Sequence, residues 1–319
     1  MGGIVCFGEV VVDIYRDEGP AEVEIPFTAR PGGAPANVAV AAAKLGQEAA
    51  FVGSVGKDLF GDFVLRALCV EGVDVSGVCR RKPPTRTSVA FVEVGEDGDR
   101  SFTFYRSHPA ADELLGPEDV AERIVSGASF VNFGSIPLLK EPSRSAIRKA
   151  AKLARDLDVP VAFDVNFREH LWPSIEEARE VVIPLFDDSY VVKLSDDELS
   201  PLLGTKSARE AVRKLLEKGV SLVLVSMGSE GAYYATGRFK GEVPAYPVEA
   251  LDATGAGDAF LAATLAYLSS EDSEGALDEE RVREAVRRGA AAGAIACTDY
   301  GAMRALPSKS ELERFMGSG

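Results

Sequence analysis

The sequence predicts an α/β protein whose mostly parallel sheet is covered by helices on both faces, with a small second sheet beside it. Short apolar runs typical of buried strands alternate with longer segments in which apolar residues recur at helical spacing. Two further extended runs are joined by a turn rich in Gly and Asp, which is a hairpin signal. Regular alternation of strands and helices favours a doubly wound parallel sheet, because each helix carries the chain back across it.

The elements of the main sheet are expected to follow one another along the chain. In segment 142–157, for example, Ile147, Ala150 and Ala154 share one face of a helix that would cover the sheet. We expect strands at 4–8, 50–55, 129–134, 159–165, 190–194 and 221–227, and helices at 142–157, 174–186, 207–218 and 279–297.

The hairpin at 88–94 and 100–106, and the strand-like run at 23–29, do not fit this alternation. We expect them to form the small sheet, from segments of about 14–31 and 85–107, within a single domain spanning residues 1–319. Long excursions from compact domains are often functional, so a lid over a site is the favoured interpretation. A decorative edge hairpin is the alternative.

Composition restricts the classes of partner. The 319 residues are 46% hydrophobic and carry a formal charge of −15, which disfavours nucleic acid and anionic membranes as partners. The sequence has no run of 18 apolar residues, so a membrane-spanning helix is not expected. The apolar run 4–12 does not fit a signal peptide, because it contains Glu9 and no basic residues precede it. The four scattered cysteines favour a reducing, cytoplasmic location, and Cys6 and Cys297 are expected to be buried.

The most informative segment is DATGAGDAF at 252–260. Gly255 and Gly257 allow a tight turn, and the apolar spacing from Phe260 onward places a helix start near Asp258. Unpaired N–H groups at a helix start bind anionic oxygens. A carboxylate there fits a general base that deprotonates an attacking hydroxyl while the amides hold a phosphoryl group. The alternative is a plain turn with Asp258 as the helix N-cap.

A second glycine-rich loop, PGGAPAN at 31–37, precedes an Ala-rich helix. Gly32 and Gly33 permit close approach of a ligand. Asn37 offers both a donor and an acceptor, which suits neutral hydroxyl groups such as those of a sugar. The alternative is a simple loop with Pro35 near a helix start.

Polar residues also follow several of the expected strands, where open α/β sheets bind their ligands. Neither a Walker P-loop nor a Rossmann glycine motif is present, so a nucleotide would be held by another route. The polar residues at the strand ends are Asp13, Asp164, Asn166, Arg168, Lys193, Ser195, Ser226 and Gly228.

The two glycine-rich segments, GGAPANVAVAAAKLG at 32–46 and DATGAGDAF at 252–260, resemble in order and separation the two signatures of the ribokinase-type (PfkB) carbohydrate kinases. The resemblance covers essentially the whole chain. Further stretches are similar to the fructokinase branch, namely TRTSVAFV at 85–92, FTFYR at 102–106, DVNFR at 164–168 and KLSDDE at 193–198.

This resemblance implies a ribokinase-like fold with a small β lid, and ATP-dependent phosphorylation of a sugar hydroxyl. It makes Asp258 the general base and the amides of Gly255, Ala256 and Gly257 the anion hole. For Arg106 and Arg168 a structural ion pair is the alternative. The implied sugar-binding residues are Asp13, Gly32, Gly33, Asn37, Phe104, Arg106 and Arg168.

The resemblance also implies ATP and Mg²⁺ as cofactors, with K⁺ as a candidate third. Glu198 would organise Mg²⁺ through water, although Ser195 stands where the family motif has Asn. Asp252 and Thr254 match a monovalent-cation site. The implied nucleotide-binding residues are Lys193, Ser195, Ser226, Gly228, Gly231, Ala292 and Cys297.

The substrate favoured by the fructokinase-like stretches is D-fructose, phosphorylated at O6. One alternative is 2-keto-3-deoxygluconate, whose carboxylate Arg106 or Arg168 could pair bidentately. Others are a ribose or nucleoside kinase and, from a different class, a catalytically silent sugar or nucleotide sensor. A homodimer formed through the lid is also expected.

Overall fold

The computed structural model describes residues 2–17, 23–94, 100–106, 109–270 and 277–317. Its main sheet has eight strands in the order β14-β13-β12-β11-β10-β9-β1-β4. Pairing is parallel from β4 to β12, and β13 and β14 add an antiparallel edge. The strands are β1 (Ile4–Phe7), β4 (Ala49–Val52), β9 (Phe130–Phe133), β10 (Val161–Asp164), β11 (Val191–Ser195), β12 (Leu222–Ser226), β13 (Ala232–Ala235) and β14 (Lys240–Val243).

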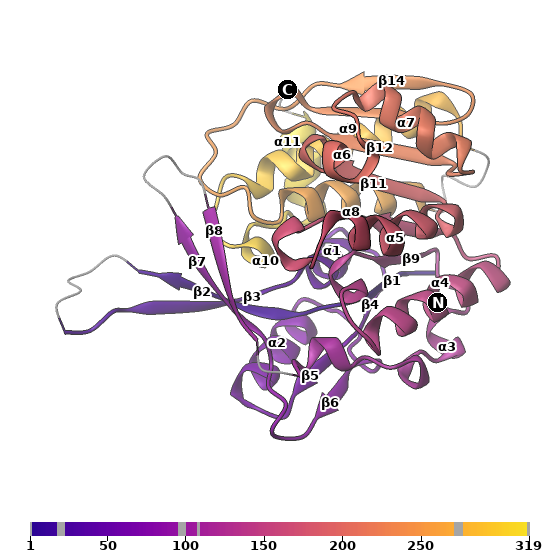
Figure 1. The fold of residues 1–319 in the computed structure, drawn as a ribbon. Helices are drawn as coiled ribbons and strands as arrows, with labels where there is room; N and C mark the ends of the chain where they lie inside the picture. The colour runs from indigo at the N-terminus through magenta and orange to yellow at the C-terminus, as the bar shows by residue number, and fades with distance from the viewer. Residues whose placement is uncertain (1, 18–22, 95–99, 107–108, 271–276, 318–319) are drawn as a thin grey trace.

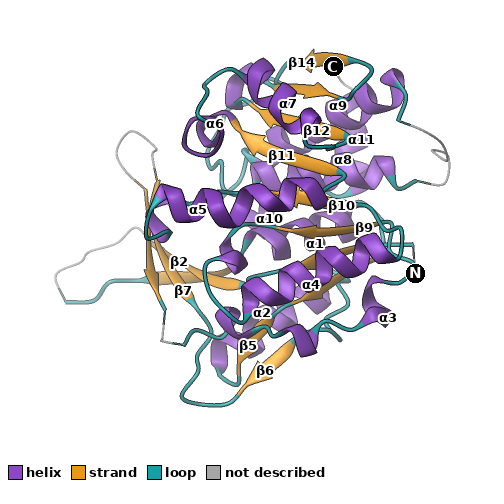
Figure 2. Cartoon of the chain, turned by 45° about the vertical axis from the view of Figure 1, so that its right-hand side comes forward, coloured by secondary structure: helices purple, strands orange, loops and turns teal. Residues whose placement is uncertain are grey.

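Helices cover both faces of this sheet, because alternate residues of each strand point to opposite sides. Figure 1 and Figure 2 show helices on both sides of the sheet. In β1, Ile4 and Cys6 join one apolar core, whereas Val5 and Phe7 join the other. The first core includes residues of α1 (Ala34–Lys44), α2 (Leu59–Val70), α8 (Ala256–Leu268), α9 (Glu279–Ala296), α10 (Ala302–Ala305) and α11 (Lys309–Gly317). The second includes residues of α3 (Glu122–Val125), α4 (Ser143–Asp156), α5 (Ile175–Val182), α6 (Asp196–Leu203) and α7 (Ala208–Glu217).

A separate four-stranded sheet projects from one side of these layers, as Figure 1 shows. We call this sheet the lid, after the role that the sequence led us to expect. Its order is β3-β2-β7-β8, with β2 parallel to β7 and the other pairs antiparallel. The strands are β2 (Val11–Arg16), β3 (Phe27–Gly32), β7 (Val89–Val94) and β8 (Arg100–Tyr105); β5 (Ser54–Gly56) and β6 (Cys79–Arg81) form a further small sheet.

The doubly wound fold with a small second sheet is confirmed, and the differences from expectation are local. The run 50–55 is divided at Gly53 into β4 and β5. The expected strand 23–29 is shifted to Phe27–Gly32, where the chain pairs with β2. The helix expected at 174–186 ends at Val182, because Pro184 cannot continue the helical hydrogen bonding and a 3₁₀ segment follows.

The burial of two cysteines was also predicted from the sequence. Cys6 is fully buried, as expected. Cys297 is only half-buried, because it is the C-cap of α9 rather than a residue of its buried face. No helix among the described residues has the length and apolar character needed to cross a membrane.

Candidate active site

The candidate site lies where the carboxyl ends of the parallel strands meet the lid and the first turn of α8. From β1 the chain first pairs with β4 on one side and later with β9 on the other, which makes β1 the point where the strand order reverses. Ligands of open α/β sheets bind at such a point. Asp13 enters the site from the lid strand β2, Asn37 from α1, and Asp258 from α8.

The turn before α8 forms a cradle of backbone amides. Gly255 has φ 85° and is the N-cap of a helix that starts at Ala256, two residues before the expected start. Within the part of the chain that the structure describes, no side chain caps the start of this helix, and the amide of Ala256 donates to the Ala253 carbonyl at 3.2 Å. A Cβ at Gly257 would lie 2.8 Å from the Lys193 Nζ. The helix start and the Lys193 ammonium together therefore favour an anion at this place.

Asp258 lies inside the first turn of α8 and is not its N-cap, so the N-cap alternative is wrong. Its side chain is buried, and the Asn37 Nδ2 donates a 2.7 Å hydrogen bond to its Oδ2. Burial and the charge of Asp164 raise the pKa of Asp258 to about 6. At neutral pH this carboxylate is ionised and has the basicity of a general base.

The opposite side of the site is formed by the second glycine loop and β2. A Cβ at Gly32 would lie 2.1 Å from the Asp13 Oδ2, and Gly33 has φ 107°, so both positions require glycine. Burial and the charge of Asp258 raise the pKa of Asp13 to about 7. Among the described residues the buried Oδ1 of Asn37 accepts no hydrogen bond, so it can accept one from a ligand hydroxyl.

Glu9 is a buried acid that reasoning from the sequence missed. It lies in the link between β1 and the lid strand β2, and only 3% of it is exposed. Burial raises the pKa of Glu9 to about 8, and the charges of Asp112 and Asp258 add to this. Among the described residues, its Oε2 has no hydrogen-bond partner. Its one signal in the sequence was an acidic residue within an apolar run.

The two arginines differ in their surroundings. Arg106 forms a 2.9 Å ion pair with Asp112, whose other oxygen accepts a hydrogen bond from Ser88, so the ion-pair alternative holds for Arg106. Arg168 lies near enough to Asp258 for its charge to lower the pKa of that carboxyl. The backbone of Phe104 pairs with Ala90 within the lid, and its side chain lies outside the described residues.

The residues assigned to the nucleotide extend from the cradle toward β12 and α9. Lys193 binds Asp164 at 2.9 Å, and although burial lowers the pKa of Lys193, the Asp164 charge raises it overall. Gly228 and Gly231 have φ of 53° and 99°; Gly228 begins a single 3₁₀ turn after β12, and Gly231 follows its last residue. Ser226 ends β12. Ala292 is buried and Cys297 half-buried, so a nucleotide would contact mainly other residues of segment 292–297.

The acidic residues assigned to metals hold backbone amides together. Glu198 accepts hydrogen bonds from the amides of Ser195, at 2.8 Å, and Phe167, and burial raises its pKa. Asp252 accepts from the amide of Thr254 at 2.6 Å and from that of Gly301 at 2.8 Å. Asp252 thus joins the turn before the cradle to a loop that precedes α10.

Comparison with known proteins shows which family this chain belongs to. Residues 1–309 match the model of the pfkB family of carbohydrate kinases. The chain belongs to this family. It is therefore a carbohydrate kinase that uses ATP as phosphoryl donor, and the site described above is its candidate active site.

Individual relatives match this kinase over almost its full length. Fructokinase-1 of Oryza sativa subsp. japonica is 40% identical over 318 residues, covering 99% of this chain and 98% of the relative. A double mutant of Vibrio cholerae O395 fructokinase, solved with fructose, ADP and a potassium ion, has a TM-score of 0.88 at 35% identity, over 99% of this chain and 98% of that one. Aminoimidazole riboside kinase of Salmonella enterica, solved with its riboside and an ATP analogue, has a TM-score of 0.84 at 31% identity, over 98% and 99%.

Proposed function

We propose that this kinase transfers the γ-phosphoryl group of ATP to the O6 hydroxyl of D-fructose, giving fructose 6-phosphate. The observation that carries the proposal is the position of Asp258, a buried carboxylate fixed by Asn37 beside the amide cradle of α8. The similarity to fructokinases over almost the whole chain supports fructose as the sugar.

In this mechanism Asp258 accepts the proton of the attacking hydroxyl as the new O–P bond forms and the bond to ADP breaks. The amides of Gly255, Ala256 and Gly257, together with Lys193, stabilise the negative charge on the phosphoryl oxygens. The lid excludes water that would otherwise hydrolyse ATP.

The sugar would be held between the lid and α1. Asp13 and Asn37 offer acceptors for its hydroxyl groups, and Gly32 and Gly33 let the backbone come close to it. We assign Arg168, and Phe104 from the lid, to the same side of the site. Arg106 would act by fixing Asp112 at the base of the lid, since it is already ion-paired.

The nucleotide would run from the cradle past Lys193 and Ser195 to the turn after β12, formed by Ser226, Gly228 and Gly231. Within the described residues, no group of three or more His, Cys, Asp or Glu side chains is arranged to hold a metal ion by itself. Mg²⁺ would therefore be held by the ATP phosphates and water, with Glu198 acting through water, and would neutralise phosphoryl charge. Asp252 and Thr254 would hold a monovalent cation, with K⁺ as the candidate.

A second substrate, 2-keto-3-deoxygluconate, is favoured by one observation. Arg168 lies close enough to Asp258 for its charge to act on that carboxyl, so it could bind the carboxylate of this sugar acid. A ribose or nucleoside kinase is the remaining alternative. The silent sensor is not proposed, because the chain belongs to a carbohydrate kinase family and has an ionisable base beside the helix start.

We also propose that residues 1–319 act as a single kinase domain, that it forms a homodimer through the lid, and that it works in the cytoplasm. The apolar lid residues Phe27 and Tyr105 are 46% and 64% exposed, which supports the dimer. Among the described residues, no disulfide joins any of the four cysteines, which supports a reducing compartment.

The experiment that tests the proposed function is a measurement of ADP formation with ATP, Mg²⁺ and one sugar at a time: fructose, 2-keto-3-deoxygluconate, ribose and a nucleoside. We expect the highest kcat/KM with fructose, and NMR should locate the phosphate on O6. A higher kcat/KM with another sugar would replace fructose as the substrate. Tight sugar binding without turnover on any of them would contradict the proposed reaction.

A further inference from the structure

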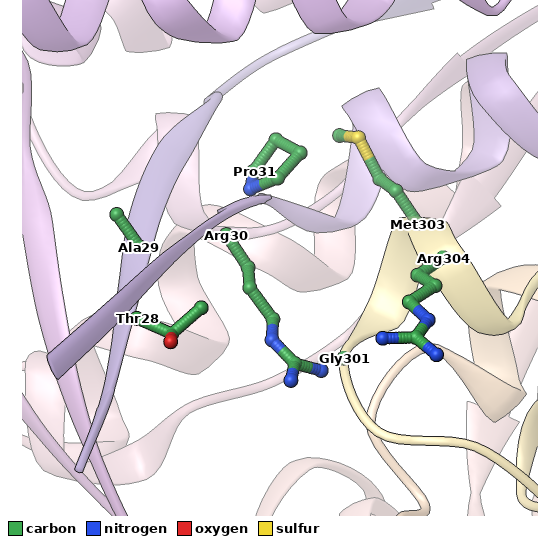
Figure 3. A pocket seen from close by; sticks show the side chains of 7 residues that line it. All are labelled: Thr28, Ala29, Arg30, Pro31, Gly301, Met303 and Arg304. Atoms are coloured by element: carbon green, nitrogen blue, oxygen red, sulfur yellow. The ribbon is translucent and has the colours of Figure 1, made fainter. Parts of the chain in front are cut away.

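An arginine of the lid reaches the loop that precedes α10. Arg30 lies in β3, an edge strand of the lid, and its guanidinium donates a hydrogen bond to the carbonyl oxygen of Tyr300. Figure 3 shows this guanidinium beside Gly301. Both residues line a cleft of about 290 Å³ between β3 and α10. A Cβ at Gly301 would lie 2.7 Å from the Arg30 Nη1, so the contact depends on glycine at this place.

The Arg30 side chain belongs to the face of the lid that carries Asp13. Arg30 is the direct partner of Asp13 in the pairing of β3 with β2, and paired residues of neighbouring strands share a face. Tyr15, two residues after Asp13, lies on that same face, and its ring centre is 5.0 Å from the Arg30 Cζ. The arginine is therefore held on the lid by an aromatic ring while its end contacts the other side of the cleft.

The loop that Arg30 contacts is connected to the phosphoryl cradle. The amide of Gly301, next to Tyr300, donates a 2.8 Å hydrogen bond to Asp252. The other carboxylate oxygen of Asp252 accepts from the amide of Thr254, which directly precedes Gly255. A continuous set of contacts thus runs from the Asp13 face of the lid to the turn that begins α8.

We propose that Arg30 is a positioning residue that fastens the lid to the 300–301 loop and so couples the position of the lid to the cradle. Arg30 touches neither the reacting atoms nor the Asp258 carboxyl in this arrangement. Its effect on sugar binding rests on the proposed function, in which the lid closes over the sugar. Its effect on the 300–301 loop does not depend on the identity of the sugar.

The chain offers a matched control in Arg304, which lines the same cleft. Its side chain is 69% exposed and pairs with Asp299 at 3.0 Å, within its own segment. Arg30→Met removes the guanidinium donor and keeps an unbranched apolar stem, and Arg304→Met makes the same change on the opposite wall. Arg30→Lys restores a positive donor.

The test combines hydrogen–deuterium exchange with steady-state kinetics. In the ligand-free protein we expect Arg30→Met to speed amide exchange in segment 299–305 about three- to tenfold, because the loop opens more often. With fructose and saturating ATP, we expect a similar rise in KM and less than about a twofold change in kcat. Arg304→Met breaks only an exposed ion pair inside 299–305, so it should leave KM unchanged and alter exchange there by less than about twofold. Arg30→Lys should lie between the wild type and Arg30→Met.

Several results would overturn the coupling. One is exchange in 299–305 that Arg30→Met leaves unchanged, and another is an equal effect of Arg304→Met. Faster exchange throughout the Arg30→Met chain would indicate general destabilisation instead. If the wild-type protein does not phosphorylate fructose, the proposed function fails, and exchange in the ligand-free protein still decides whether Arg30 holds the loop.

Discussion

At the scale of single residues, the chemistry depends on how the fold sets the protonation of buried carboxyl groups. Asp258, Asp13 and Glu9 lie close enough for the charge of Asp258 to raise the pKa of the other two. Burial is the largest cause of each shift, and nearby like charge adds to it. Asp258 is the one of the three whose Oδ2 accepts a hydrogen bond from Asn37, which stabilises its ionised form.

Asp258→Asn tests the general base. Because the amide cannot accept the proton, we expect kcat to fall by about 10²–10⁴, with a melting temperature close to that of the wild type. In the wild-type enzyme kcat/KM should fall as the pH drops below about 6, where Asp258 becomes protonated. A loss of about tenfold or less would leave Asp258 with a role in positioning only.

Glu9→Gln tests how much the ionisation of the buried Glu9 carboxyl destabilises the folded protein. The folded-state pKa of about 8 lies above the ordinary value of 4.5, so the folded protein keeps a proton that the unfolded chain releases between these values. The stability that this proton contributes is present below pH 4.5 and is lost as the pH rises through 8. We therefore expect similar melting temperatures for Glu9→Gln and wild type at pH 4.5, and a higher one for the variant at pH 8.5.

Melting curves across this pH range provide the measurement, and the difference should correspond to on the order of a few kcal/mol. If the melting temperatures of the two proteins differ by the same amount at every pH, Glu9 does not titrate between pH 4.5 and 8.5.

At the scale of elements, residue 257 in the first turn of α8 affects both the stability of the helix and the position of the Lys193 ammonium. Helix stability favours Ala over Gly at residue 257, because Gly has a high conformational entropy in the unfolded chain. The Lys193 ammonium, however, lies where the Ala Cβ would point, and Lys193 is held there by Asp164. Gly257 therefore gives room to the ammonium at some cost to the helix.

Gly257→Ala should separate activity from stability. We expect kcat to fall about tenfold or more, because displaced Lys193 no longer stabilises the phosphoryl charge, while the melting temperature stays near the wild-type value. Gly237→Ala is the control, since a Cβ there meets nothing within 4 Å. Kinetics and thermal melts of both variants measure this, and unchanged kcat for Gly257→Ala would remove the contact from the mechanism.

At the scale of the whole molecule, the lid has two different faces. One carries Asp13 and Arg30 toward the site. The other carries Phe27, Phe91 and Tyr105, whose rings pack edge to face at centroid distances of 5.5 and 4.9 Å. An apolar, partly exposed surface of this kind is typical of association.

Tyr105→Glu combined with Phe27→Glu tests the proposed dimer. If the lids pair through this face, we expect the double variant to be a monomer by light scattering at a concentration where the wild type is a dimer, because burying charges is costly. Val70→Glu is the control, since Val70 is 78% exposed but lies in α2 outside the lid. A wild type that is already monomeric, or a dimer that survives the double change, would exclude this interface.

Much of the fold follows from local patterns that sequence carries directly. Buried strands such as β12 are continuous apolar runs, and each amphipathic helix repeats its apolar residues every three or four positions, so the doubly wound class was predictable. The ends of the individual strands and helices were less predictable. One expected strand is divided at Gly53. A side chain at this position would lie 2.6 Å from the Gly8 carbonyl oxygen, a close approach of a distant segment that the local pattern does not reveal.

The sequence by itself determined the glycine turn, the acid that follows it and the second glycine loop, because these depend on residues adjacent in the chain. Tertiary structure decided the environment of that acid. Asn37, Asp164 and Lys193 reach Asp258 from three different elements, and burial and charge at short distance set its pKa. Tertiary structure also decided the burial of Glu9. It decided the hydrogen bond from Arg30 to the Tyr300 carbonyl as well, because these residues are 270 positions apart in the chain.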